Sequence, residues 1–147
     1  MQFNNGNFLI ETIVPKDELI ISRTDLKGVI TYANDTFAEI SGYSVDELIG
    51  KNHNIVRHPD MPKVIFKDLW TKLKAEGHWS GFVKNLRKDE GFYWVYAEIS
   101  QVIKNGELVE YKSVRTPMPF EDKIKYQLYY DELREKNKEL LRRVIYQ

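Results

Sequence analysis

The chain has no cysteine among its 147 residues, which excludes disulfides, thiolate chemistry and zinc–thiolate sites. It also has no charge excess, because 22 basic and 22 acidic side chains cancel. Nothing therefore favours nucleic acid or an anionic membrane as a partner. No apolar run approaches the roughly 18 residues of a membrane helix. The N-terminus MQFNNGNFLIET has no basic segment followed by an apolar one, so we expect a cytoplasmic protein without a secretory signal.

Catalytic patterns are missing as well. No nucleophile stands beside a base, and no glycine-rich phosphate loop is present, so the sequence does not predict an enzyme. Aromatic residues, in contrast, are plentiful at 13% of the chain, and several fall between residues 79 and 96. They are compatible with a well-filled core and equally with a pocket for a flat ligand.

Hydrophobic patterning predicts an α+β domain. Five segments rich in β-branched and aromatic residues are expected to be strands: 20–24, 29–33, 79–88, 92–104 and 108–116. Short helices are expected after Asn34 and after the capping box Ser44-Val-Asp-Glu47, and a longer one between Pro62 and Gly77. This order predicts a five-stranded antiparallel sheet with helices on one face.

The chain divides into three predicted parts: an N-terminal cap at 1–18, a sensory domain at 19–119 and a signalling helix at 120–147. The last part contains neither glycine nor proline and is rich in Lys, Arg, Glu and Leu. A heptad frame fits it, with d positions at Tyr126, Leu133, Leu140 and Gln147 and a positions at Tyr130, Asn137 and Val144. An asparagine at an a position favours a parallel dimer. The alternative is a helix that packs on its own domain.

Residues 52–62, NHNIVRHPDMP, form the most unusual polar segment. Arg57, His58 and Asp60 stand almost side by side between two predicted helices. Such a segment is either a solvated loop whose charges pair with one another or a wall that holds an anionic group.

Several motifs resemble those of PAS domains: Asn34-Asp-Thr-Phe37, Ser41-Gly-Tyr43 and Gly50-Lys-Asn52. Further motifs are similar to the flavin-binding PAS domain of the Aer energy-taxis receptors over residues 19–118: the 52–62 segment, Trp79-Ser-Gly81, Lys84-Asn85 and Tyr93-Trp94-Val95. The resemblance implies a PAS fold and FAD held without a covalent link, with the redox state of FAD as the signal. It also implies output to a downstream HAMP or chemoreceptor module. Receptors of this kind are membrane-anchored, so the chain is expected to be an excised input domain or a short soluble relative.

The resemblance also implies a set of cofactor-binding residues. Arg57 suits a pyrophosphate, since a guanidinium can hold two oxygens at once. His58 would donate to a phosphate or stack on the adenine, and Asp60 would orient its neighbours or accept from a ribose hydroxyl. Trp79 and Asn85 share one strand face and would serve the flavin ring. The remaining members of the set are Asn34, His53, Trp70 and Arg115, and Trp70 and Trp79 are equally compatible with plain core positions.

A contrast with LOV photosensors, another flavin-binding branch of PAS proteins, narrows the expected signal. His53 stands where LOV domains carry a reactive cysteine, so no thiol–flavin adduct can form. Asn85 matches the first ring-binding asparagine of LOV domains, but Val95 replaces the second and Arg115 replaces a glutamine. A buried arginine stays charged and favours a negatively charged reduced ring. We therefore expect a redox sensor rather than a light sensor.

Two other functions remain open from the sequence. One is a haem PAS gas sensor with His53 or His58 as the axial ligand. The other is a cofactor-free PAS dimerisation module.

Overall fold

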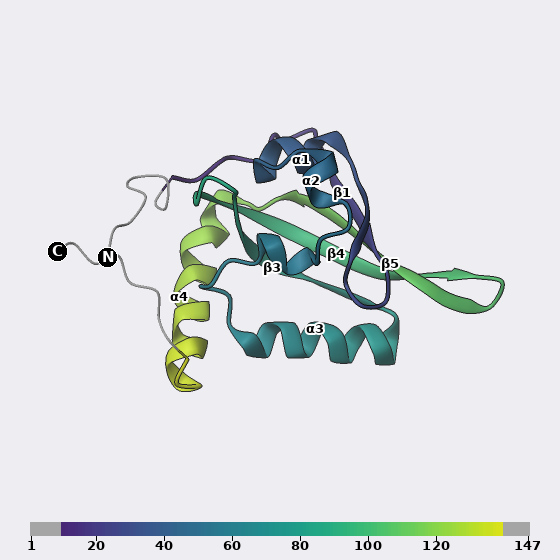
Figure 1. The fold of residues 1–147 in the computed structure, drawn as a ribbon. Coiled ribbons are helices and arrows are strands. Elements are labelled where there is room, and N and C mark those ends of the chain that lie inside the picture. Colours follow the sequence, from purple (N-terminus) through teal and green to yellow (C-terminus); the bar gives the residue numbers. More distant parts are fainter. Residues whose placement is uncertain (1–9, 140–147) are drawn as a thin grey trace.

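The computed structural model describes residues 10–139. The strands are β1 (Ile20–Thr24), β2 (Ile30–Ala33), β3 (His78–Leu86), β4 (Phe92–Lys104) and β5 (Glu107–Pro117). The helices are α1 (Asp35–Ser41), α2 (Val45–Leu48), the 3-10 helix η2 (His53–Val56), α3 (Lys63–Glu76) and α4 (Phe120–Lys136). Figure 1 shows their arrangement.

The five strands form one antiparallel sheet in the order β2-β1-β5-β4-β3, which confirms the predicted fold class. Because β5 pairs with both β1 and β4, it joins the first strands of the chain to the later ones. The β4–β5 hairpin extends beyond the rest of the sheet (Figure 1). Its turn uses positive φ angles at Asn105 and Gly106, as the Asn-Gly pair predicts.

Local capping explains where the short helices begin and end. The Asn34 side chain accepts from the Phe37 amide at the start of α1. At α2, Ser44 and Glu47 form the reciprocal capping box that the sequence predicts. Helix α3 ends at Gly77, whose φ of 84° suits glycine.

The face of the sheet covered by α1, α2, η2 and α3 carries most of the core. Successive residues of a strand point to opposite faces, and on β3 Val83 and Asn85 point to this inner face. Phe37 from α1 and Leu73 from α3 are fully or almost fully buried against it. The inner layer therefore positions any site that lies between helices and sheet.

Helix α4 packs on the outer face of the sheet. Ring pairs join Phe82 to Tyr126 at 4.6 Å and Trp94 to Tyr130 at 6.2 Å, and the Tyr130 hydroxyl donates to the Phe82 carbonyl at 2.7 Å. Leu133 also packs against the core. The apolar a and d side chains of the described heptads thus face the chain's own sheet.

The expected continuous heptad through Asn137 is wrong for the described residues. Helix α4 ends at Lys136, and Lys138 adopts a φ of 56°, so the chain leaves the helix there. The Glu139 amide donates to the Arg134 carbonyl, which closes the helix end in a Schellman-type turn. Leu140, Val144 and Gln147 lie outside the described residues. Dimerisation stays a prediction, and the exposed apolar side chains that α4 offers for it are Phe120, Ile124, Leu128 and Tyr129.

None of the helices in the described residues combines the length and the hydropathy that crossing a bilayer requires. The described part of the N-terminal segment lies along the start of β4. The Thr12 amide donates to the Phe92 carbonyl at 2.8 Å, and Glu11 pairs with Lys123 of α4 at 2.6 Å.

Candidate functional site

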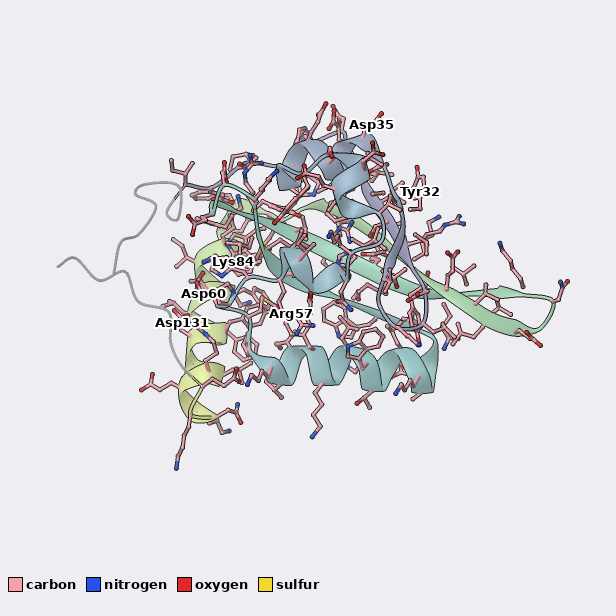
Figure 2. The ribbon with its side chains drawn as sticks, in the orientation of Figure 1. Tyr32, Asp35, Arg57, Asp60, Lys84 and Asp131 are labelled. Atoms are coloured by element: carbon pink, nitrogen blue, oxygen red, sulfur yellow. The ribbon has the colours of Figure 1, made fainter. Side chains whose placement is uncertain are left out.

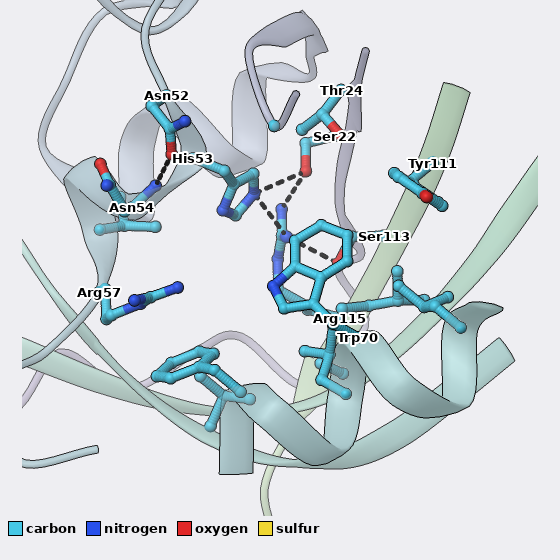
Figure 3. A pocket seen from close by; sticks show the side chains of 18 of the residues that line it. Ser22, Thr24, Asn52, His53, Asn54, Arg57, Trp70, Tyr111, Ser113 and Arg115 are labelled. Atoms are coloured by element: carbon cyan, nitrogen blue, oxygen red, sulfur yellow. Dashed lines mark hydrogen bonds between the residues drawn. The ribbon is translucent and has the colours of Figure 1, made fainter. Parts of the chain in front are cut away.

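A cavity of about 310 Å³ lies between the inner face of the sheet and the helices η2 and α3 (Figure 3). Its volume falls in the range of roughly 300–1,000 Å³ that small-molecule pockets occupy. The apolar part of its wall comes from η2, α3, β3, β4 and β5: Val56, Phe66, Leu69, Trp70, Leu73, Val83, Ala97, Ile99 and Tyr111. Such a wall suits a flat, largely apolar ring system.

The mouth of the cavity is polar and partly basic. Lining residues that are exposed to solvent mark its position: Lys27, Asn52, Asn54, Arg57 and Trp70. The Arg57 guanidinium stacks on the Phe66 ring, 3.7 Å from its centroid. This contact holds a cation at the rim, where an anionic extension of a bound ring would leave the cavity.

Arg115 is the main charged group inside the cavity wall, and it is 2% exposed. Its Nη1 donates to Ser113 Oγ at 2.8 Å, and its Nη2 donates to Ser22 Oγ at 3.0 Å. Its guanidinium also lies 4.6 Å from the Phe37 ring centroid. No carboxylate of the described residues forms an ion pair with it, and its Nε has no hydrogen-bond partner among them.

Burial lowers the pKa of Arg115 to about 10, so this side chain stays charged at neutral pH. Desolvating a cation without a counter-ion is costly. The cavity therefore contains a fixed positive charge that an electron-rich or anionic ligand edge would satisfy.

His53 of η2 lies beside this cation (Figure 3). Its Nε2 accepts from Arg115 Nη1 at 3.2 Å and lies 3.1 Å from Ser22 Oγ, and its ring stacks on Phe37 at 5.6 Å. Burial, with a smaller contribution from Arg115, lowers the pKa of His53 from 6.5 to about 3. The imidazole is therefore neutral, with Nε2 serving as an acceptor.

Replacing His53 by Asn should make the domain less sensitive to acid. The folded-state pKa of about 3 lies below the ordinary 6.5, so the unfolded chain takes up a proton that the folded protein excludes. The stability that neutral His53 provides is complete above about pH 6.5 and is lost as the pH falls toward 3. Urea titrations at neutral pH and at about pH 4.5 should show a smaller loss of unfolding free energy in His53→Asn than in the wild type. His78→Asn, at an exposed histidine of β3, is the matched control, and equal losses in all three proteins would contradict the expectation.

Five of the nine residues expected from the sequence line this cavity: His53, Arg57, Trp70, Asn85 and Arg115. Arg57 and Asn85 are also joined by an isolated antiparallel β-bridge, which brings the 52–62 segment against β3. Asn85 is 5% exposed and pairs in register with Tyr93 of β4. The structure thus gathers a cation, an amide and an imidazole around one cavity.

His58 and Asp60, in contrast, do not line the cavity. The His58 ring is 1% exposed, its Nδ1 accepts from the Asp60 amide at 3.0 Å, and its edge packs on Phe92. Asp60 is 9% exposed and forms ion pairs with Lys84 and Arg134 on the outer side of β3. Arg57 bridges to Asn85, whereas Asp60 contacts Lys84, the preceding residue of β3, whose side chain points to the opposite face of the sheet.

Trp79 and Asn34 also lie outside the cavity lining. The Trp79 ring covers Gly81, where an added Cβ would come within 2.6 Å of it, and its Nε1 donates to Asp68 at 3.1 Å. Asn34 Oδ1 accepts from the Ile21 and Phe37 amides, and its Nδ2 donates to Leu19. The contacts of these two residues are with the fold itself, and their part in cofactor binding stays a prediction.

Sequence reasoning missed Ser22 and Ser113, the two hydroxyls that accept from Arg115. A usable signal was present: both are small polar residues within strands otherwise rich in large side chains. Lys112, which also lines the cavity, was missed as well. Their proximity depends on the β1–β5 pairing, which places Ser22 opposite Ser113.

A family model described as PAS fold matches residues 30–115. The chain belongs to the PAS family. Over 105 residues it is 49% identical to the aerotaxis receptor of Escherichia coli strain K12, which confirms the resemblance to Aer-type PAS domains. That match covers 71% of this chain and 21% of the receptor. The nitrogen fixation regulatory protein of Klebsiella pneumoniae is 32% identical over 108 residues, which are 73% of this chain and 22% of that protein.

Solved PAS structures share the fold. The LOV domain of the blue-light photoreceptor Aureochrome1, in its light state, superposes with a TM-score of 0.64 at 20% identity, covering 81% of this PAS chain and 91% of that chain. At this identity the likeness shows the fold alone. The matched part of this PAS chain spans about a fifth of the length of the two curated relatives described above.

Proposed function

We propose that this PAS domain is the FAD-binding input module of a signalling protein and that it reports the redox state of the flavin. The observation that carries the proposal is Arg115, a buried cation without a counter-ion among the described residues, placed in the wall of a largely apolar cavity. A flavin ring has an apolar body and a polar edge that gains negative charge on reduction. That combination satisfies both the apolar wall and the cation.

The chain's own residues have distinct parts in this proposal. The apolar side chains of α3 and β4 exclude water from the ring, and Asn85 and Arg115 offer donors to its polar edge. Arg57, held by Phe66 at the mouth, would bind the pyrophosphate of FAD. The likeness to a protein named as an aerotaxis receptor supports a sensory role. We further propose that this domain passes its signal to a HAMP or chemoreceptor module. A homodimer is part of the same proposal.

The haem alternative has less support from the geometry. His53 offers its Nε2 to Arg115 and Ser22, and a ligand bond to iron would displace both contacts. His58 is buried away from the cavity. A cofactor-free module would leave a charged cavity without a ligand, at a cost in free energy.

The test is the visible spectrum of the purified full chain, followed by chromatography of the acid-released cofactor. The proposal expects the two bands of flavin, and FAD rather than FMN in the extract, because FMN lacks the second phosphate and the adenosine that would extend past Arg57 at the mouth. A single intense Soret band would instead indicate haem. A protein that remains colourless after incubation with FAD would contradict the proposed function.

A further inference from the structure

A buried cluster of charges lies where the 52–62 segment, β3 and α4 meet. Its members are Asp60, Lys84 and Arg134, which are 9%, 8% and 2% exposed. Figure 2 labels Asp60, Lys84 and Asp131 close together beside α4. No residue of the cluster lines the cavity. We call these three side chains the clasp.

Asp60 is the centre of the clasp because each of its carboxylate oxygens binds a different element. Oδ2 accepts from Lys84 Nζ of β3 at 2.9 Å, and Oδ1 lies 3.4 Å from Arg134 Nη1 of α4. Lys84 also donates to Gln127 of α4 at 2.9 Å, and Arg134 pairs with Asp131. One loop residue therefore joins α4 to the edge strand.

A buried ion cluster is not required to hold a helix on a sheet. Apolar residues of similar volume often give equal or greater stability, since burying charges costs desolvation energy. The aromatic contacts of Tyr126 and Tyr130 already supply an apolar interface for α4. What the ions add is geometric: they fix the position of Asp60 relative to both neighbours.

Two clasp residues, Lys84 and Asp60, are close in the chain to residues of the cavity wall. Lys84 directly precedes Asn85, and the two side chains point to opposite faces of β3. Asp60 follows Arg57 by three residues, and the bridge between Arg57 and Asn85 ties the two strands of chain together. A movement of the cavity wall at Arg57 or Asn85 would therefore displace the backbone that carries Asp60 and Lys84.

A second tether leads from the end of α4 to the start of α3. The Lys63 amide donates to both carboxylate oxygens of Glu139, at 3.1 and 3.3 Å. Pro62 provides no side-chain cap for α3, so Glu139 serves one of its unpaired amides. Helix α3 carries Phe66 and Trp70 into the cavity wall. Arg134 at the end of α4 and Glu139 just after it thus hold Asp60 and the start of α3.

We infer that Asp60 is a positioning residue whose clasp couples the docking of α4 to the occupation of the cavity. With the clasp closed, the segment that follows Arg57 is fixed, and Arg57 is held at the cavity mouth against Asn85 of the wall. Because coupling between two sites is reciprocal, a bound ligand also holds α4 on the sheet. The identity of the ligand as FAD rests on the proposed function.

The test compares the full chain with Arg134→Met, which removes one cation of the clasp while keeping an apolar side chain in its place. Asp60 keeps Lys84 as its partner, so the variant should fold. FAD affinity should fall about 5- to 150-fold, the usual range of coupling between sites, although Arg134 does not line the cavity. Lys136→Met, at an exposed cation of α4, is the matched control and should bind FAD like the wild type.

Hydrogen exchange supplies a readout that a merely structural role would not change. In the wild type, FAD should slow exchange of the α4 amides, and in Arg134→Met this protection should be reduced. Arg134→Lys, which keeps the charge, should restore part of the protection and of the affinity.

Three results are decisive. The expected pattern supports the coupling. Equal FAD affinity in wild type and Arg134→Met, with α4 exchange independent of FAD, would overturn it and leave the proposed function intact. If FAD binds to none of the proteins, the proposed function fails and this inference fails with it.

Discussion

Arg115→Met should weaken flavin binding by about ten- to hundredfold while leaving the ligand-free domain as stable as the wild type or more stable. A bond from a charged donor is worth about 1.5–3 kcal/mol, which corresponds to that loss of affinity. In the ligand-free domain the same guanidinium is a buried cation without a counter-ion among the described residues, so removing it relieves a desolvation cost. The two effects have opposite signs because the ligand supplies the negative charge that the described residues do not offer to Arg115.

Flavin titrations and urea denaturation of the apo form measure the two effects separately. Arg23→Met is the control, since Arg23 is a partly exposed cation on β1 that does not line the cavity. Arg115→Gln should also lower the reduction potential of retained flavin, because the reduced ring carries the negative charge that the cation favours. A large loss of apo stability with unchanged flavin affinity would assign Arg115 a structural role instead.

The parts of the fold that sequence reasoning predicted well depend on local interactions. The capping box at Ser44 and the turn at Asn105 and Gly106 involve residues within three positions of one another. The order of strands and helices follows from the period of the apolar residues. Like the cap and the turn, this period can be recognised within a short stretch of sequence. The fold class could be predicted from that order of elements. The strand order β2-β1-β5-β4-β3 was not predicted, because the β1–β5 pairing joins residues about 90 positions apart in the chain.

The side chains of the 52–62 segment show where this reasoning ends. The sequence shows that Arg57, His58 and Asp60 cluster, but their directions depend on partners far along the chain. Asp60 pairs with Lys84, 24 residues away, and with Arg134, 74 residues away. Only the packing of α4 on β3 brings these partners together. The pattern therefore indicates a functional loop without separating its cavity side from its outer side.

Helix α4 illustrates a second limit. An apolar stripe with heptad spacing fits a partner helix, and it fits the outer face of the chain's own sheet equally well. Tyr126 and Tyr130 take the second option, where Phe82 and Trp94 provide a matching aromatic surface. Spacing along one helix states which side chains are buried together, but it does not identify the surface that buries them.

Replacing Asp60 and replacing Arg57 should have different consequences, although both belong to one polar segment. Asp60→Ala leaves Lys84 and Arg134 buried without their shared carboxylate, and removing one partner of a buried pair costs about 3–5 kcal/mol. Arg57→Ala removes a partly exposed side chain at the cavity mouth, so stability should change little. Its flavin retention should fall about ten- to hundredfold, through loss of one charge-assisted bond to the cofactor phosphates.

Urea denaturation of the flavin-free proteins measures the stability difference without any contribution from the ligand. The triple variant with Asp60→Ala, Lys84→Met and Arg134→Met is the decisive companion, because it removes the two buried cations together with the carboxylate that they share. It should regain most of the stability that Asp60→Ala loses, since apolar side chains of similar length can replace a buried ion cluster. An Asp60→Ala protein of wild-type stability that fails to retain flavin would show the opposite, a carboxylate that acts on the cofactor directly.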